Sequence, residues 1–137
     1  MINFHSESID FKVINPIKTK RWLKSVIKDE GFELLEINYI FCNDEYLHKI
    51  NVEYLDHDTL TDIITFDNSE EDELIEGDIF VSVERIIDNC KDFNTTFEQE
   101  FRRVIVHGLL HLCGYFDKTD EDEKQMRAKE DYHIRHW

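Results

Sequence analysis

The residues of this chain best suited to chemistry are two histidines, His107 and His111, and an aspartate that follows them, Asp117. Two residues four apart lie about one turn apart on the same face of an α-helix. Gly114 can end that helix in a left-handed turn, after which the chain can return Asp117 to the imidazoles. Two nitrogens and a carboxylate oxygen are a familiar ligand set for zinc, and three protein ligands leave a coordination position open. The stretch therefore predicts a metal site of the catalytic kind.

Other interpretations of these residues stay open. The two histidines could be core residues hydrogen-bonded to their neighbours, and Cys113 offers a sulfur beside them. Asp117 could instead cap the turn before the last helix, in which case Asp120 would be the ligand. The helix around the histidines is largely apolar, and burying unpartnered polar groups costs about 1–3 kcal/mol each, so a bound metal is favoured. Gly108 stands where HExxH peptidases carry their general-base glutamate, which disfavours proteolysis.

Hydrophobic periodicity and cap residues predict the elements that must hold this site. Residues 1–4 and 9–13 indicate one or two short strands, one of them at a sheet edge. The other expected elements are a helix over 17–30, a strand over 34–41, a helix capped by Asn43 or Asp44, adjacent antiparallel strands over 61–66 and 77–83, a helix from Glu84, a helix ending near Cys113, and a last helix opened by Thr119. Together they predict one α+β domain over residues 1–137, with the HxxxH helix in its core.

Three local expectations are specific. A capping box of Thr95 with Glu98 should start the HxxxH helix. Arg103 precedes the two histidines at the same spacing and completes a polar stripe on that helix. On the helix that follows Asn43, we expect Tyr54 to face inward together with Leu47 and Ile50.

The remaining histidines are weaker candidates. His133 and His136 form a second pair, but they lie near the end of the chain, where we expect surface residues. Among the isolated histidines only His57 is of interest, because it lies just before the strand at 61–66.

Composition limits the class of protein. A chain of 137 residues with 41% hydrophobic residues fits one packed domain. Its net charge of −15 disfavours a nucleic-acid partner and favours a basic protein partner. The charge is uneven, however. The acidic segment 67–76 should be mobile and outside the core. A basic cluster could be a solvated helix face or a local binding surface, and it consists of Lys18, Lys20, Arg21, Lys24 and Lys28.

Compartment can also be inferred. Cys42, Cys90 and Cys113 have no disulfide-like or CxxC spacing, which indicates reduced buried thiols in a cytoplasmic protein. We expect no signal peptide and no membrane association, because no apolar stretch approaches the length that spans a bilayer.

Three segments carry a family resemblance. The chain resembles the YbeY family of metal-dependent endoribonucleases and rRNA maturation factors in the segments NVEYLDHDTLTDIITF (51–66), EGDIFVS (76–82) and HGLLHLCGYFD (107–117). They follow, in order, the family patterns N-x-x-Y-R, T-D-V-L-S-F, G-D-I-x-x-S and H-G-x-L-H-L-x-G-Y-D-H. The resemblance implies a small fold with a four-stranded mixed sheet flanked by helices. It also implies one zinc ion, or another divalent transition metal, at the head of a cleft, and work on ribosomal RNA in the bacterial cytoplasm.

Two positions depart from the family pattern. The third metal ligand is usually histidine, whereas this chain has Asp117, whose charge should weaken the Lewis acidity of the metal. The arginine that follows the tyrosine in the family is Leu55 here, although His57 or Arg103 could reach the site. The resemblance further implies that the cleft is shaped by Thr61, Asp62, Gly77 and Asp78, and we expect Arg103 to line it as well.

The main hypothesis is therefore a zinc-dependent, single-strand-type endoribonuclease that acts in ribosomal RNA maturation and ribosome quality control at the small ribosomal subunit. His107, His111 and Asp117 would hold the metal, and a water with lowered pKa would be the nucleophile. No further catalytic residue can be assigned. The alternative is a non-catalytic ribosome-assembly factor with a structural metal, whose acidic surface docks a basic ribosomal protein. The net charge of −15 and Leu55 favour that alternative.

Overall fold

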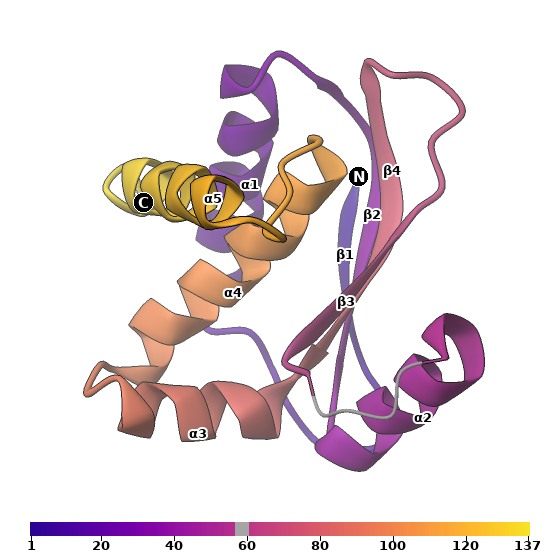
Figure 1. Ribbon diagram of the computed structural model, residues 1–137, viewed down its shortest axis with the longest axis vertical. Coiled ribbons are helices and arrows are strands. Elements are labelled where there is room, and N and C mark those ends of the chain that lie inside the picture. Colours follow the sequence, from indigo (N-terminus) through magenta and orange to yellow (C-terminus); the bar gives the residue numbers. More distant parts are fainter. Residues whose placement is uncertain (57–60) are drawn as a thin grey trace.

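A four-stranded mixed sheet organises the fold in a computed structural model that describes residues 1–56 and 61–137 (Figure 1). The strands are β1 (Ile2–Ser6), β2 (Glu33–Cys42), β3 (Ile63–Asp67) and β4 (Leu74–Ser82), in the order β1-β2-β4-β3. β1, β2 and β4 are parallel neighbours, whereas β3 pairs antiparallel with β4. The expected edge strand and the antiparallel pair are confirmed. Residues 9–13 form no strand, and their apolar side chains pack against the core instead.

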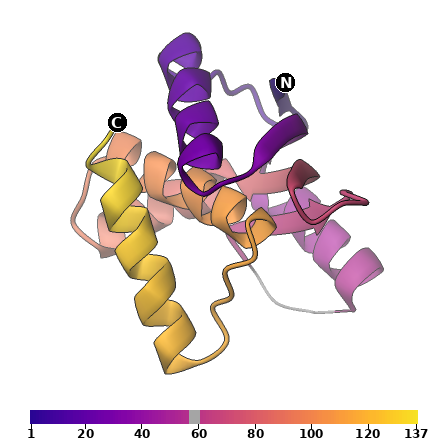
Figure 2. The same cartoon turned by 90° about the horizontal axis from the view of Figure 1, so that it is seen from above.

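Five helices are present in the described part of the chain. They are α1 (Pro16–Asp29), α2 (Asp44–Leu55), α3 (Val83–Asp92), α4 (Phe97–Leu112) and α5 (Asp120–Ile134). Helix α4 contacts β3, β4, α1, α3 and α5, and Figure 2 shows it between the sheet and the outer helices. The expected α+β fold, with the HxxxH helix in its core, is confirmed. Among the helices described, none is long and apolar enough to cross a membrane.

The close contact between α4 and the sheet depends on glycine at position 108. A Cβ atom there would lie 2.6 Å from Ile63 Cδ1 and 3.0 Å from Ile79 Cγ2. Gly108 therefore faces the sheet and not the side of α4 that carries the histidines. Ile105 and Leu109, its neighbours on the buried side, are fully inaccessible, and the Tyr39 hydroxyl donates to the Ile105 carbonyl at 2.7 Å. Packing thus accounts for a small residue between the two histidines.

The helix caps show which helix starts could be predicted from local sequence. Asn43 accepts from the Tyr46 amide and caps α2, as one of the two expected residues. Thr119 caps α5, which is also confirmed. The capping box of α4 is Thr96 with Gln99, so the expected pair of Thr95 and Glu98 is wrong by one residue. Thr95 instead donates its hydroxyl to the Gln99 side chain at 2.5 Å.

Burial corrects four further expectations. Tyr54 is 69% exposed and does not join Leu47 and Ile50 in the interior. The acidic segment contributes to the core after all, because β4 begins at Leu74 and Ile75 is 1% exposed. His133 is 2% exposed, not a surface residue, because it lies on the inward side of α5. Of the three free cysteines only Cys42 is buried. His57 lies outside the described residues.

Candidate metal centre

Three donor atoms meet where α4 ends. The Nε2 atoms of His107 and His111 lie 3.0 Å apart, and each lies 3.3 Å from Oδ2 of Asp117. Gly114, at a φ of 98°, turns the chain after α4 and allows Asp117 to come back beside the imidazoles. The structure therefore brings together the three residues that the spacing had suggested. Asp120, the first residue of α5, is not part of this cluster.

Hydrogen bonds fix which ring nitrogens face one another. His107 Nδ1 lies 2.6 Å from Glu130 Oε2, and His111 Nδ1 lies 3.0 Å from the backbone carbonyl of Tyr115. An ionised carboxylate and a carbonyl can only accept, so each Nδ1 must carry a proton and donate it. In the neutral imidazoles both Nε2 atoms then present lone pairs toward the same point. Such second-shell acceptors orient metal-binding histidines.

The spacing of the donors fits a small tetrahedral ion. With zinc bonds of about 2.0–2.1 Å, two ligands of a tetrahedral site lie about 3.3 Å apart. The three donor separations here are 3.0, 3.3 and 3.3 Å. Two lone pairs and a carboxylate held this close would repel unless a cation or a proton lies among them. The cluster can therefore hold a divalent metal and leaves its fourth side free.

The pKa values of the two histidines shift in opposite directions. Burial disfavours the charged form of His107, but the hydrogen bond to Glu130 and its charge outweigh this and raise the pKa of His107. Burial, followed by the neighbouring charge of His107, lowers the pKa of His111. Burial also raises the pKa of the Cys113 thiol to about 12, which disfavours thiolate ligation. The imidazoles and the carboxylate are thus the better donors.

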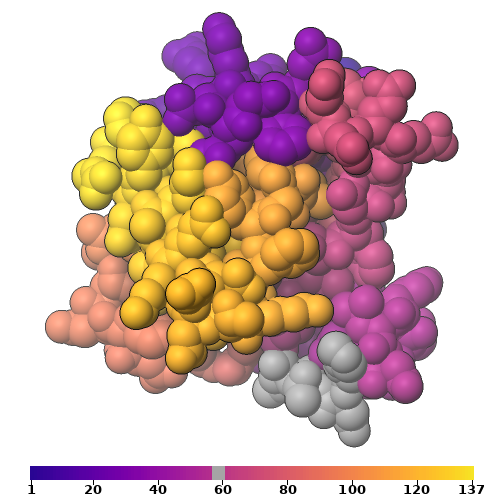
Figure 3. Space-filling model, turned by 45° about the horizontal axis from the view of Figure 1, so that its top comes forward, coloured from indigo at the N-terminus to yellow at the C-terminus, as the bar shows by residue number. Residues whose placement is uncertain are grey.

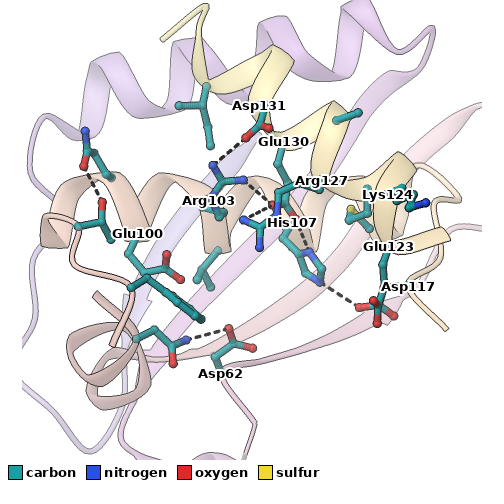
Figure 4. A pocket seen from close by; sticks show the side chains of 18 of the residues that line it. Asp62, Glu100, Arg103, His107, Asp117, Glu123, Lys124, Arg127, Glu130 and Asp131 are labelled. Atoms are coloured by element: carbon teal, nitrogen blue, oxygen red, sulfur yellow. Dashed lines mark hydrogen bonds and ion pairs between the residues drawn. The ribbon is translucent and has the colours of Figure 1, made fainter. Parts of the chain in front are cut away.

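Glu130 connects the metal centre to Arg103. Its side chain is 6% exposed, and its second oxygen, Oε1, accepts from Arg103 Nη1 at 2.8 Å. Arg103 also donates to Asp131 at 2.8 Å, so α5 engages both ends of the guanidinium (Figure 4). Burial disfavours the charge of Glu130, but the hydrogen bonds from His107 and Arg103 lower its pKa. Arg103 therefore neutralises the carboxylate that orients His107.

A cavity of about 1240 Å³ opens beside the centre, between α4 and α5. Its lining includes two of the expected cleft residues, Asp62 and Arg103, together with His107 and Asp117 (Figure 4). Asn89 donates to Asp62 at 3.4 Å, and burial raises the pKa of Asp62. Acidic lining residues outnumber basic ones by seven to three; they are Asp62, Glu100, Asp117, Asp120, Glu123, Glu130 and Asp131 against Arg103, Lys124 and Arg127.

The other expected cleft residues lie elsewhere. Thr61 donates to the carbonyl of Ile63 at 3.2 Å, a local contact outside the cavity lining. Gly77 allows β3 and α4 to approach, since a Cβ there would lie 2.5 Å from the Phe66 carbonyl oxygen and 3.1 Å from Leu112. Asp78 accepts from Asn38 at 3.1 Å and from Asn68 at 3.2 Å. Because successive side chains of a strand alternate, Asp78 lies on the sheet face opposite to that of Gly77 and α4.

A second buried cluster supports the turn from behind. Glu30, which follows α1, accepts from the Tyr115 hydroxyl at 2.6 Å, from His133 at 2.7 Å and from Lys129 at 3.3 Å. The side chains of Glu30 and His133 are 5% and 3% exposed. Since the Tyr115 carbonyl accepts from His111, this cluster ties α1 and α5 to the metal centre.

Sequence reasoning missed Glu130, Glu30 and Tyr115. One signal was available for Glu130 and His133, because they lie four and seven residues after Met126, on one side of a helix. That side is the buried face of α5. Exposed charged residues surround the buried ones in this segment and obscure the helical spacing of the buried face. For Glu30 the sequence gives no signal, because its partners lie at least 85 residues away.

Comparisons with known proteins identify related chains. A model of the family described as endoribonuclease YbeY matches residues 2–137. The endoribonuclease YbeY of Flavobacterium johnsoniae is 60% identical over 134 residues, which cover 98% of this chain and 95% of the relative. That of Cytophaga hutchinsonii is 49% identical over 130 residues, covering 95% and 91%. The solution structure of TM1509 from Thermotoga maritima aligns with a TM-score of 0.67 and 29% identity, over 98% of this chain and 87% of that one.

Proposed function

This chain belongs to the endoribonuclease YbeY family, and we propose that its activity depends on a zinc ion held by His107, His111 and Asp117. Membership makes the protein a hydrolase that cleaves RNA internally in the maturation of ribosomal RNA. The observation that carries the metal assignment is the convergence of two imidazole Nε2 atoms and one carboxylate oxygen within 3.3 Å of one another.

The donor set suits hydrolysis. A bound zinc ion supplies Lewis acidity, which lowers the pKa of water and offsets charge on a phosphate. The protein's own part is to hold the three donors: Glu130 fixes the ring of His107, and the Tyr115 carbonyl fixes that of His111. Asp117 is 43% exposed at the cavity side, so solvent reaches the centre there. Another divalent transition metal with the same preference for nitrogen and oxygen remains compatible with this set.

Arg103 has a supporting role in this proposal. Its guanidinium makes hydrogen bonds of 2.8 Å to both Glu130 and Asp131, so its charge is already compensated by α5. It does not replace the arginine that the family carries where this chain has Leu55. Arg103 contributes by keeping Glu130 ionised and directed at His107.

A second role is supported by the charge of the cavity. With seven acidic and three basic lining residues, the cavity suits a basic segment better than bare phosphate. We propose that a basic ribosomal protein of the small subunit docks there, in ribosome assembly and quality control. Such docking would take place in the cytoplasm, where ribosomal RNA is matured. It accompanies RNA cleavage and does not replace it.

The two roles separate experimentally. Metal analysis of protein purified without chelator should find about one zinc ion per chain, and His107→Ala and His111→Ala should each lose it. Both variants should also lose cleavage of structured RNA, but they should still capture a basic ribosomal protein in a salt-dependent manner. If both variants retain full metal occupancy, the metal proposal is wrong. If the parent captures no basic protein at low salt, the docking proposal is wrong.

A further inference from the structure

One side of α1 is strongly basic although the chain as a whole has a net charge of −15. Lys18, Arg21, Lys24 and Lys28 follow one another at steps of three, three and four residues, and all four are exposed. Residues at these steps are neighbours on a helix surface. We call these four residues the α1 basic face. The only acidic residue in α1 is Asp29, at its last position.

The charges of this face are not compensated within the described part of the chain. Arg21, Lys24 and Lys28 have neither an ion pair nor a side-chain hydrogen bond there, and the Lys18 ammonium lies 4.6 Å from the centre of the Trp137 ring. Some cations elsewhere are paired, such as Arg103 with two carboxylates and Arg85 with Asp44. Unpaired cations that lie side by side produce a local positive potential, and local potential governs which ligand approaches.

The α1 basic face leads toward the metal centre. Glu30, two residues after Lys28, contacts the Tyr115 hydroxyl, and the Tyr115 carbonyl accepts from His111. In the space-filling view α1 borders the α4 and α5 region on a single face of the molecule (Figure 3). Lys18 and Lys28 are ten residues apart, so the face is about 15 Å long, enough for several nucleotides. An extended polyanion could therefore run along α1 and continue to the centre.

We propose that the α1 basic face binds the phosphate backbone of a single-stranded stretch of the RNA whose cleavage is the proposed function. This inference rests on that function, and it answers a problem that the cavity raises. The cavity lining is mainly acidic and repels phosphates, so the backbone needs a positive track outside it. The α1 basic face is such a track in the described structure, and the end of α1 adjoins the turn at Tyr115 through Glu30.

The test is the salt dependence of RNA binding by two matched variants. Lys24→Gln with Lys28→Gln removes two charges from the α1 basic face. Lys49→Gln with Lys91→Gln removes two exposed charges from α2 and α3, at the other end of the molecule (Figure 1). Binding of a fluorescent single-stranded RNA is measured in chelator, so that metal-dependent cleavage does not interfere, between about 50 and 200 mM salt.

Counterion release predicts the outcome. Each lost phosphate contact reduces the slope of log affinity against log salt by about 0.7 for single-stranded RNA, so the α1 pair should reduce it by about 1.4. Over that salt range, the parent should then lose about sevenfold more affinity than the α1 variant. The α2–α3 variant should keep the parent slope. With metal restored, the α1 variant should raise KM and leave kcat unchanged.

Several results would overturn the inference. Equal slopes for the two variants would mean that the α1 basic face is merely solvated. Loss of binding to phosphatidylserine vesicles by the α1 variant, with RNA binding unchanged, would assign the face to a membrane surface. Failure of the proposed function has a different signature, because the parent would then bind RNA with the full slope but show no metal-dependent cleavage.

Discussion

Replacing Glu130 with glutamine should weaken zinc binding although Glu130 itself is not a donor. Its two oxygens accept separately, one from His107 Nδ1 at 2.6 Å and one from Arg103 at 2.8 Å. Glutamine has a single acceptor oxygen, and its amide group is a donor, so one of the two contacts must be lost. Arg103 would still be bonded to Asp131. Zinc binding is therefore affected through the contact between residue 130 and His107.

The size of the effect follows from the burial of this contact. Glu130 is 6% exposed and His107 is 22% exposed, so water compensates the loss only in part. Losing a second-shell partner of a metal-binding histidine typically costs 10- to 100-fold in affinity, or about 1.4–2.7 kcal/mol. We therefore expect Glu130→Gln to raise the zinc dissociation constant within that range. Competition against a chromogenic zinc chelator at fixed pH measures it.

Asp131→Asn is the matched control. Asp131 binds the same arginine at the same distance, but it is 45% exposed and does not contact His107. It should change zinc affinity less than about threefold, because an exposed ion pair contributes about 1 kcal/mol or less. The reasoning is refuted if Glu130→Gln binds zinc as tightly as the parent. It is equally refuted if the two variants weaken zinc by the same factor, since the effect would then run through Arg103.

Three further predictions concern other parts of the molecule. Asp117→Asn should weaken zinc binding because an amide is a poorer zinc ligand than a carboxylate. Asp117→His should retain zinc, and Asp120→Asn should bind zinc as the parent does. Equal loss of zinc binding in the two Asn variants would remove Asp117 from the donor set. Glu30→Gln should cost about 1–3 kcal/mol of unfolding free energy at neutral pH, measured with urea, because it breaks a buried cluster. Burial alone would raise the pKa of Glu30, but its hydrogen-bond partners lower it. The stability that Glu30 contributes is therefore present above its unfolded pKa and is lost as pH falls through the folded pKa, below which the parent and the variant should converge. A gap that persists after both forms are protonated would show that packing, not ionisation, is responsible. Shortening the loop at 68–73 between β3 and β4 should change the unfolding free energy by less than about 1 kcal/mol, and a larger loss in the same assay would show that the loop packs.

The metal centre could be predicted to a large extent because its determinants are local. His107 and His111 are one helical turn apart, and Gly114 has the positive φ that the turn requires. Local patterns alone also explain why the predicted capping box of α4 is wrong by one residue. Thr95 with Glu98 and Thr96 with Gln99 are equally good local patterns, and only the path of the chain into α4 decides between them.

Contacts over long sequence distances were beyond such reasoning. The place of His133 near the end of the chain predicts a surface residue, but the packing of α5 brings its ring to Glu30, 103 positions earlier. Asp78 follows a glycine in a segment that matches the family pattern G-D-I-x-x-S, yet strand alternation directs it away from α4. Ile75 was assigned to an acidic loop because its neighbours are charged, although pairing with β2 extends β4 through it. In each case the deciding information is which element lies opposite.

The most direct measurement of the central claim is cleavage of a structured ribosomal RNA fragment by chelator-treated protein, before and after zinc is restored. Cleavage should be absent after chelation and should return in proportion to zinc, with full activity at about one ion per chain. His107→Ala treated in the same way should not recover. Undiminished cleavage by protein shown to contain no metal, or recovery by His107→Ala equal to that of the parent, would contradict the account.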